Sequence, residues 1–548
     1  MKTLSGRPAS PRGCSSRSVL RPIESRGPGK PPWPHHAVAI FISGSLMSRS
    51  QVRFHAVDFQ YEGQPEFLFQ GLDLSLTPGW TGIVGANGTG KTTLLKLGLG
   101  LLSPSKGQVD AQPGGLYCAQ ETEIPPQGYE EFIASQDGES HRIQGLLGLA
   151  EDWTWRWSSL SHGERKRAQL GVALWRRPPI LAADEPTNHL DRPARDLVRR
   201  ALAEYRGIGL LVSHDRELLD QLCQACVFVE PPRAVLRPGN YSQASVQAAL
   251  ERTAAGRARE SARRKAEALV RETVIRRDEA SQAHRKRSKR GLDPKDHDTR
   301  GKINLARLTG KDGQAGRLLR QLQGRVDQAR QRLDSLQVPK EYTTGIRLGG
   351  SISRRNSLVR LPQGHLALGP KRKLIYPELV VYPSDRIALT GPNGAGKSTL
   401  MRALLAKTSL PENEVLYIPQ EIDSAQAQQI LERVLGTSSR ERGRLMTLMS
   451  RLGSRPERLL GTASPSPGEV RKLMLALGLL ASPHWIVMDE PTNHMDLPSV
   501  ECLEKALAEV PCALLLASHD EHFLKALSSR RWEIHGSESG GNRILVVL

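Results

Sequence analysis

The chain contains the stretch DEPTNHLD at residues 184–191 and repeats it as DEPTNHMD at residues 489–496. Each copy follows a short apolar run, ILAA before the first and WIVM before the second. An apolar run that ends in two acidic residues is typical of a buried strand that carries carboxylates to the edge of an α/β sheet where ligands bind. The repeat therefore predicts a duplicated α/β architecture with a ligand site in each half.

A glycine-rich loop precedes each acidic stretch. Residues 85–92 read GANGTGKT after the apolar run GIV, and residues 391–398 read GPNGAGKS after IAL. Both match GxxxxGK[ST], in which backbone N–H groups surround phosphates, the lysine neutralises the β- and γ-phosphates and the hydroxyl ligates Mg²⁺. The expected nucleotide-contacting residues are Gly85, Asn87, Gly88, Gly90, Lys91, Thr92 and Thr93 in the first loop, and Gly391, Asn393, Gly394, Gly396, Lys397, Ser398 and Thr399 in the second.

Further landmarks keep their order in both halves. An offset of 305 or 306 residues relates Lys91 to Lys397, Glu185 to Glu490 and His214 to His519. Gln120 and Gln420 follow the same order with an offset of 300. Agreement at several independent positions indicates a duplication, and it makes a chance match of either loop very improbable.

A serine and a glycine introduce a helix-like run in each half, in LSHGE at residues 160–164 and PSPGE at residues 465–469. A hydroxyl and bare amides at a helix N-terminus form an anion-binding arrangement. Alone, each segment would be an ordinary capped helix start, but its place inside the repeat favours nucleotide binding. The tryptophans just upstream are interpreted as packing residues rather than a base-stacking platform: Trp153, Trp155 and Trp157.

Together these motifs resemble the ABC-F family of ATP-binding cassette proteins, over about residues 50–548. The resemblance implies an α/β fold of two cassettes that pair within one monomer and enclose two ATP molecules with Mg²⁺. Ser466 and Gly468 would then face the first loop, while Ser161 and Gly163 would face the second. The sequence departs from the family's signature at His162, Pro465 and Pro467. The last of these removes a backbone amide from the first site.

The resemblance also implies the role of each polar group in hydrolysing ATP to ADP and phosphate. The glutamates of the acidic stretches orient or deprotonate the attacking water, and the preceding aspartates hold Mg²⁺ through water. The catalytic set is Glu185, Glu490, His214, His519, Gln120 and Gln420, and the metal set is Thr92, Asp184, Gln120, Ser398, Asp489 and Gln420. Tyr61 is the candidate to stack on the first adenine, whereas the second half offers only His365 as a weak substitute.

Between the cassettes, the sequence predicts a helical hairpin. Two segments carry an apolar residue every three or four positions, which is typical of a helix with one apolar face. The first stripe is Val246, Leu250, Ala254, Ala258, Ala262, Ala266 and Leu269, and the second is Leu318, Leu322, Val326, Ala329, Leu333 and Leu336. Because small alanines permit close approach, we expect the helices to pack antiparallel. The predicted domains are an N-terminal extension (1–48), a first cassette (49–242), the hairpin linker (243–340) and a second cassette (341–548).

The net charge of +20 is concentrated in two segments. Residues 251–340 carry a surplus of 13 positive charges and residues 1–50 a surplus of 7, so the rest of the chain is neutral. The run RKRSKRG at residues 285–291 forms the expected hairpin tip, where it favours binding to a phosphate backbone. Few aromatic residues accompany it, which favours folded RNA over stacked single strands. The resemblance implies that this linker contacts ribosomal RNA and transfer RNA.

Residues 1–46 are rich in Pro, Arg, Ser and Gly and cannot bury enough surface to fold alone. They are read either as an organelle transit peptide or as an extension upstream of a start at Met47, and we favour the second. Six cysteines in 548 residues do not make a disulfide framework, so Cys223 and Cys226 are expected to be buried thiols. No apolar stretch reaches 18 residues, and a cytoplasmic protein without a membrane domain is expected.

The sequence thus predicts an ATPase whose paired cassettes control ribosome binding, as a translation factor or as a protein that protects ribosomes from an antibiotic. Two other classes of ATPase are the alternatives. An ATPase subunit of a membrane transporter would need a membrane partner, and a charged hairpin between fused cassettes argues against it. A DNA-associated repair-type ATPase would bring zinc-binding cysteine sets, which the sequence does not contain.

Overall fold

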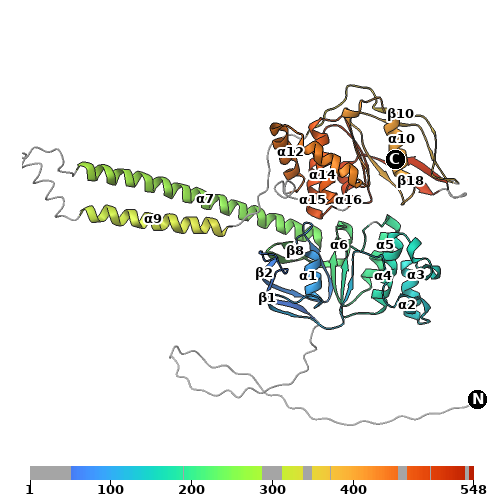
Figure 1. Cartoon of the computed structure of the whole chain (residues 1–548), viewed down its shortest axis with the longest axis horizontal. Helices are drawn as coiled ribbons and strands as arrows, with labels where there is room; N and C mark the ends of the chain where they lie inside the picture. Colours follow the sequence, from blue (N-terminus) through green and yellow to red (C-terminus); the bar gives the residue numbers. More distant parts are fainter. Residues whose placement is uncertain are drawn as a thin grey trace, which may run out of the picture. The chain divides into compact units, whose positions relative to one another are not determined.

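A computed structural model describes residues 51–188, 190–286, 311–336, 349–370, 372–454, 466–493, 495–536 and 542–548. Figure 1 shows two α/β cassettes and a pair of long helices. The predicted α/β class with two cassettes and a helical insert is confirmed.

The central sheet of the first cassette positions the glycine-rich loop at the end of its middle strand. Its strand order is β5 (Leu116–Cys118), β6 (Ile180–Asp184), β7 (Ile208–Val212), β3 (Gly79–Val84), β8 (Cys223–Glu230) and β9 (Arg233–Pro238). The first five strands are parallel, and β9 is antiparallel to β8. A smaller antiparallel sheet has the order β2 (Phe69–Leu76), β1 (Val52–Phe59) and β4 (Lys106–Asp110).

The helices of the first cassette connect these strands. They are α1 (Lys91–Gly98), α2 (Tyr129–Ala134), α3 (Gly138–Leu147), α4 (His162–Trp175), α5 (Arg192–Ala203) and α6 (Arg216–Leu222), with short 3₁₀ turns η1 (Glu151–Thr154) and η2 (Trp157–Ser159). Trp153 and Trp157 are buried as predicted, but Trp155 is 87% exposed, so its predicted packing role is wrong. Cys223 and Cys226 are buried free thiols, as expected.

The second cassette repeats the same strand order and adds two strands at one edge. The sheet runs β11 (Gly364–Ala367), β12 (Lys373–Tyr376), β19 (Arg543–Val547), β18 (Arg530–Gly536), β14 (Arg386–Thr390), β17 (Ala513–Ala517), β16 (Trp485–Asp489) and β15 (Val415–Ile418). A two-stranded sheet pairs β10 (Val359–Leu361) with β13 (Leu379–Val381). The helices are α10 (Lys397–Lys407), α11 (Ser424–Leu435), α12 (Ser439–Arg451), α14 (Pro467–Leu480), α15 (Leu497–Glu509) and α16 (Glu521–Leu527), with the turn η3 (Glu412–Glu414).

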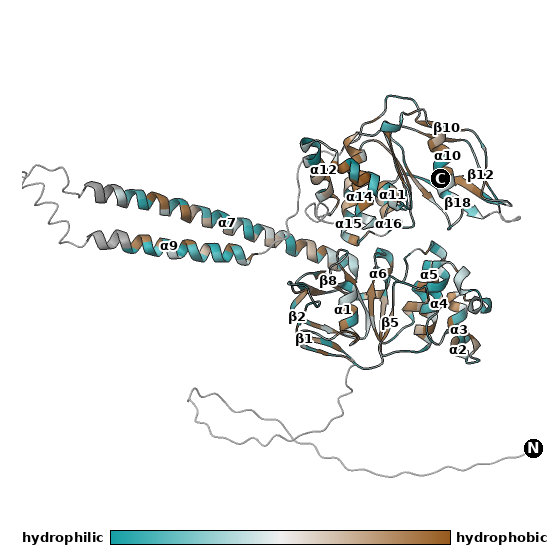
Figure 2. Cartoon of the chain, viewed as in Figure 1, coloured by the Kyte–Doolittle hydropathy of each residue, from teal (hydrophilic) through white to brown (hydrophobic). Residues whose placement is uncertain are grey.

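Each sheet is buried on both faces, which explains why its strands read as continuous apolar runs. On β6, Leu181 and Ala183 join one hydrophobic cluster, while Ile180 and Ala182 join the cluster on the other face. The residues of β16 alternate between two clusters in the same way. Figure 2 shows hydrophobic residues along the central strands of each cassette. The acidic stretch therefore leaves the sheet at a fixed, buried position in both halves.

The linker forms two helices, α7 (Tyr241–Lys286) and α9 (Lys311–Ser335), which lie side by side (Figure 1). Ala262 and Ala266 of the first helix are buried, as are Leu322 and Val326 of the second. The predicted stripe is therefore confirmed in its middle part. Nearer the cassettes the remaining predicted positions of α7 are exposed, namely Val246, Leu250, Ala254 and Ala258, because that part of α7 lies against the first cassette on other residues. The basic run 287–291 lies outside the described residues.

The start of α7 is held between the two cassettes. The Tyr241 ring stacks on Phe228 of β8, with ring centroids 6.4 Å apart and an interplanar angle of 14°. Its hydroxyl donates to the Glu501 carboxylate of α15 at 2.6 Å. Leu497, the first residue of α15, is buried in the hydrophobic cluster of the first cassette that also includes Tyr241 and Ala244. The base of the hairpin thus contacts both cassettes.

Candidate functional site

Both glycine-rich loops connect a central strand to a helix, and both need glycine at the helix start. Gly90 caps α1 with φ 92°, and Gly396 caps α10 with φ 102°. A side chain at Gly90 would be strained by this left-handed backbone, and its Cβ would lie 2.7 Å from Leu68 Cδ2. The loop is therefore wrapped tightly, which directs backbone amides and the helix N-terminus toward one point.

The loop lysines lie inside these turns. Lys91 Nζ donates to the Gly85 and Ala86 carbonyls at 3.0 and 3.2 Å, and Lys397 Nζ donates to the Gly391 carbonyl at 2.8 Å. Burial lowers the pKa of both lysines, although the nearby carboxylates partly oppose the shift. A largely buried cation surrounded by backbone amides is suited to a multiply charged anion.

Each loop hydroxyl is close to the aspartate that ends the neighbouring strand. Asp184 Oδ2 accepts from Thr92 Oγ1 at 2.7 Å and from the Tyr117 hydroxyl at 3.0 Å. In the second half the buried Asp489 carboxylate lies beside the Ser398 hydroxyl. Burial raises the pKa of Asp489, and Ser398 and Lys397 partly oppose that shift. A hydroxyl beside a buried carboxylate with free lone pairs fits a hydrated Mg²⁺.

No group of three or more His, Cys, Asp or Glu residues that could hold a metal ion occurs among the described residues. This does not conflict with a Mg²⁺ site. Mg²⁺ usually keeps several waters and takes only one or two protein carboxylates, with phosphate oxygens completing its shell. The two hydroxyl–aspartate pairs are sufficient protein ligands of that kind.

The glutamates after the two aspartates have an unusual backbone conformation. Glu185 and Glu490 have φ values of 49° and 48°, in the left-handed region that costs a residue with a Cβ about 1–3 kcal/mol. Their backbone amides donate to Val212 and Ala517 of the adjacent strands at 2.9 and 2.8 Å. Burial raises the pKa of Glu490 to about 7 and raises that of Glu185 as well. Both carboxyls are therefore suited to accept a proton near neutral pH.

A buried histidine lies beside each glutamate. His214 Nε2 is 3.0 Å from Glu185 Oε1, and His519 Nε2 is 3.4 Å from Glu490 Oε1. Burial, together with the charge of the loop lysine, lowers the pKa of both histidines to about 3. The imidazoles are therefore neutral at physiological pH. His519 Nε2 also lies 3.0 Å from Asn393 Oδ1 and 3.1 Å from Lys397 Nζ.

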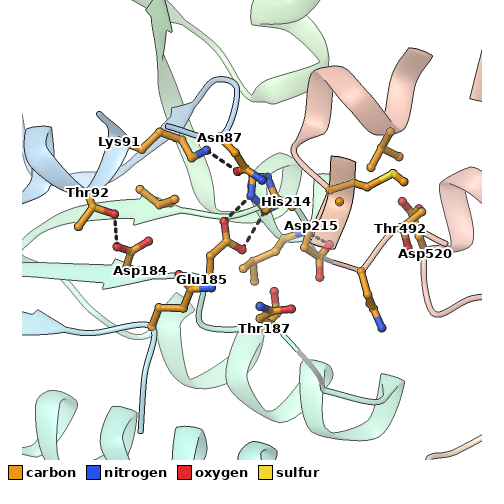
Figure 3. A pocket seen from close by; sticks show the side chains of 18 of the residues that line it. Asn87, Lys91, Thr92, Asp184, Glu185, Thr187, His214, Asp215, Thr492 and Asp520 are labelled. Atoms are coloured by element: carbon orange, nitrogen blue, oxygen red, sulfur yellow. Dashed lines mark hydrogen bonds and ion pairs between the residues drawn. The ribbon is translucent and has the colours of Figure 1, made fainter. Parts of the chain in front are cut away.

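A cavity of about 710 Å³ brings the first loop together with residues of the second cassette. Figure 3 shows the first-cassette side chains on one side and Thr492 and Asp520 of the second cassette on the other. Its lining includes Tyr61, Lys91, Thr92, Gln120, Asp184, Glu185 and His214, together with Ser466, Gly468 and Asn493. The volume is within the usual range for a small-molecule site. The structure thus places the predicted residues of both cassettes around one space.

The two signature-like segments cap helices. Ser161 and Ser466 are the N-caps of α4 and α14, and each forms a reciprocal capping box with the glutamate three residues later. Pro467 occupies the first helical position, where a missing N–H costs no helical hydrogen bond. Ser466 and Gly468 line the cavity of the first loop. The pairing of Ser161 and Gly163 with the second loop stays a prediction.

Three other predicted residues occupy distinct positions. The Tyr61 hydroxyl is 2.7 Å from Thr93 Oγ1, and its ring packs edge-on against Phe59 at the mouth of the cavity. His365 is exposed on β11. The Gln420 main-chain carbonyl accepts from Arg471, as that of Gln120 does from Lys166. Base stacking on Tyr61 and water positioning by the glutamines stay predictions.

The last aspartate of each acidic stretch was missed as a site residue. Asp496 caps α15 and its Oδ2 accepts from the Asn87 backbone amide of the first loop at 2.6 Å. Asp191 caps α5 and its Oδ2 is 3.5 Å from the Asn393 amide of the second loop. Both belong to the repeated stretch, but sequence alone could not show that they reach the opposite cassette.

A buried cation that donates to the main-chain carbonyl of each glutamine was also not predicted. Lys166 is fully buried, and its Nζ donates to the Ala119 and Asp184 carbonyls at 2.5 and 3.2 Å. Arg471 takes the same place in the second repeat, where its guanidinium donates to the Asn493 and Gln420 carbonyls. The shared register was a signal that could have identified them, since both follow the Ser-x-Gly-Glu segment at the same distance.

Comparisons with known proteins agree with this geometry. A family model described as ABC transporter matches residues 69–188 and 377–493. The ribosome protection protein VmlR of Bacillus subtilis (strain 168) is 26% identical over 481 residues, which cover 86% of this chain and 84% of that protein. The ATP-binding protein Uup of Caulobacter vibrioides is 30% identical over 493 residues, which cover 86% of this chain and 75% of that protein.

A solved structure of the archaeal ribosome recycling factor aABCE1, in complex with the ribosomal stalk protein aP1, is similar with a TM-score of 0.57. The two chains are 19% identical, and the likeness covers 90% of each. At this identity the comparison concerns the fold. Among the residues that the structure describes, none of the helices combines the length and hydropathy that crossing a bilayer requires.

Proposed function

Because this chain belongs to the ABC-F family of ATP-binding cassette proteins, we propose that its paired cassettes hydrolyse ATP to ADP and phosphate in order to control binding to the ribosome. The observation that carries the ATPase part is the cavity that joins Lys91, Asp184 and Glu185 to Ser466 and Gly468. One cassette supplies the phosphate loop and the base, and the other supplies a capped helix start. Hydrolysis therefore requires that the cassettes be paired.

Within the first site, each residue has a separate task. Lys91 and the loop amides neutralise and orient the β- and γ-phosphates. Thr92 and Asp184 would hold Mg²⁺, which when bound neutralises charge on the phosphate oxygens. Glu185, with its raised pKa, accepts the proton of the attacking water. The His214 backbone amide donates to Glu185 Oε2 and helps to orient that carboxylate, while the neutral imidazole contacts the γ-phosphate.

The second site repeats this arrangement with Lys397, Ser398, Asp489, Glu490 and His519 as the corresponding residues. Its Mg²⁺ ligands would be the Ser398 hydroxyl and the buried Asp489 carboxylate, which lie beside each other. We include Gln120 and Gln420 as the residues that link metal and water at the two sites, because each follows the strand next to its aspartate.

The partner in this proposal is RNA of the ribosome, bound through the linker 243–340. The linker holds 13 of the 20 surplus positive charges, which favours a phosphate backbone. Its two helices extend from the first cassette as a hairpin, and the exposed face of α7 includes Arg257, Arg264 and Arg271. The relative VmlR is named a ribosome protection protein, and that name supports the same class of partner.

The test uses the double substitution Glu185→Gln with Glu490→Gln, which keeps ATP binding and removes both bases. We expect the double variant to cosediment with ribosomes in ATP and the unchanged chain to be released as ATP is consumed. The matched control is Glu204→Gln, an exposed glutamate away from both sites. Binding of ATP by the double variant without accumulation on ribosomes would reject the proposal.

A further inference from the structure

Arg195 reaches the second ATP site from the first cassette. It lies in the first turn of α5, four residues after Asp191. Its Nη1 donates to the main-chain carbonyl of His519 at 3.1 Å, and its Nε donates to the Leu190 carbonyl of its own cassette at 3.0 Å. The guanidinium thus ties the acidic stretch of one cassette to the histidine of the other.

His519, whose carbonyl accepts the hydrogen bond from Arg195, contacts several groups of the second site. The His519 imidazole lies within 3.4 Å of Asn393, Lys397 and Glu490. The His519 amide also donates to Glu490 Oε2 at 3.3 Å, so the backbone of this residue is fixed on both sides of its Cα. Displacement of that backbone would change the contacts to the loop and to the base together.

The environment of Arg195 suits a positioning role. Its side chain is 23% exposed, and the nearest acidic group is Asp215 of its own cassette, with Nη1 3.9 Å from Oδ2. That distance is longer than a hydrogen bond, so the ordered donor geometry is directed at the two carbonyls. A hydrogen bond from a charged guanidinium to a carbonyl is stronger than one between neutral groups, so this contact can order the His519 backbone.

The first site has no counterpart at this position. In the register of the repeat, Val500 of α15 stands where Arg195 stands in α5. Val500 is 2% exposed, and its side chain has no hydrogen-bond donor. The two sites therefore differ in whether this position of the opposite cassette supports the histidine.

We propose that Arg195 is a positioning residue of the second ATP site, which it completes from the opposite cassette by holding His519. The proposal rests on the proposed ATPase function. It makes hydrolysis at the second site depend on cassette pairing through a contact that the first site lacks at that position.

The experiment isolates each site before changing Arg195. The Glu185→Gln chain turns over ATP at the second site, and the Glu490→Gln chain turns it over at the first. In the first background, we expect Arg195→Leu to lower the single-turnover rate of bound ATP about tenfold and to leave the steady-state KM nearly unchanged. A tenfold loss corresponds to a rise of about 1.4 kcal/mol in the activation free energy. Arg195→Lys keeps a charged donor and should recover part of the rate. In the second background we expect a smaller loss, because Arg195 also lines the cavity of the first site but donates its hydrogen bond to His519 of the second.

Arg200→Leu is the matched control, because Arg200 lies in the last turn of α5, is exposed and does not line the cavity of the first site. An equal loss in both backgrounds, no loss in either, or an equal loss with Arg200→Leu would overturn the role of Arg195. The role of Arg195 would also be overturned if the single glutamate substitutions did not leave one active site each. Failure of the proposed function gives a different result, namely hydrolysis that persists when both glutamates are replaced.

Discussion

The first ATP site and the second share their loop lysine, aspartate, glutamate and histidine, but they differ in what the opposite cassette contributes. The first site receives Ser466 and Gly468 across a helix start that begins with Pro467, and it has Tyr61 at its mouth. The second receives Arg195, and His365 is exposed on its edge strand. The duplication therefore kept the groups that we propose to act on phosphate, while the contacts from the opposite cassette differ.

The largest difference should follow from removing one base at a time. Glu185→Gln and Glu490→Gln should each lower hydrolysis at the affected site by about 10²–10⁴-fold, because a positioned base typically contributes that factor. The overall rate then reports the remaining site, and steady-state ATPase assays of both variants measure how the sites share turnover. Identical rates for the two variants would contradict the asymmetry.

Replacement of the buried Lys166 should lower the free energy of unfolding. Lys166→Met leaves the Ala119 and Asp184 carbonyls without their donor, and each buried unpaired group costs about 1–3 kcal/mol. We expect the free energy of unfolding to fall by at least that amount in urea titration. Lys106→Met, which changes an exposed lysine of β4, is the control, and an unchanged midpoint in the Lys166 variant would show that the carbonyls find other partners.

The rate of ATP hydrolysis should rise with pH at both sites. A general base must be deprotonated, so activity rises as the pH increases through its pKa. The pKa of Glu490 is raised to about 7, and burial raises that of Glu185 too. In the free enzyme, kcat/KM for ATP should therefore rise severalfold between about pH 6 and 8 in each single-glutamine variant. A flat profile over this range would show that the glutamates do not accept the proton.

The smallest effect concerns the amide that Pro467 lacks. Pro467→Ala restores an N–H at the first turn of α14, beside the cavity of the first site. One added hydrogen bond contributes about 0.5–1.5 kcal/mol, so ATP binding to the Glu185→Gln chain should tighten about two- to tenfold. Pro498→Ala in the first turn of α15 serves as control. Weaker binding in the Pro467 variant would mean that the proline itself organises the helix start.

The sequence predicted the fold and the parts of the sites that are local in the chain. The apolar runs before Asp184 and Asp489 indicated buried strands, and the glycine pattern indicated the loops. It could not indicate that Glu185 and Glu490 adopt a left-handed backbone, because that conformation is imposed by hydrogen bonds to neighbouring strands. The exposure of Trp155 was missed because its neighbours Trp153 and Trp157 suggested a common packing role.

Contacts between the cassettes were the least predictable part. Asp496 reaches Asn87 across 409 positions of sequence, and Arg195 reaches His519 across 324. Neither residue type distinguishes such a contact from an ordinary helix start or a solvated charge. The repeat register supplies a partial guide, since it aligns Asp191 with Asp496, but it also aligns Arg195 with Val500.

The attachment of α7 has a mechanical consequence. Helix α15 is hydrogen-bonded to the first loop through Asp496 and to the base of the hairpin through Glu501. Both contacts therefore lie on one short helix. Helix α7 has 46 residues and is therefore about 69 Å long at about 1.5 Å per residue. A tilt of about 5° at Tyr241 would move its far end by about 6 Å, roughly one helical turn. A small rotation at the base of α7 is therefore amplified at its far end, and that base lies within one helix length of a phosphate loop.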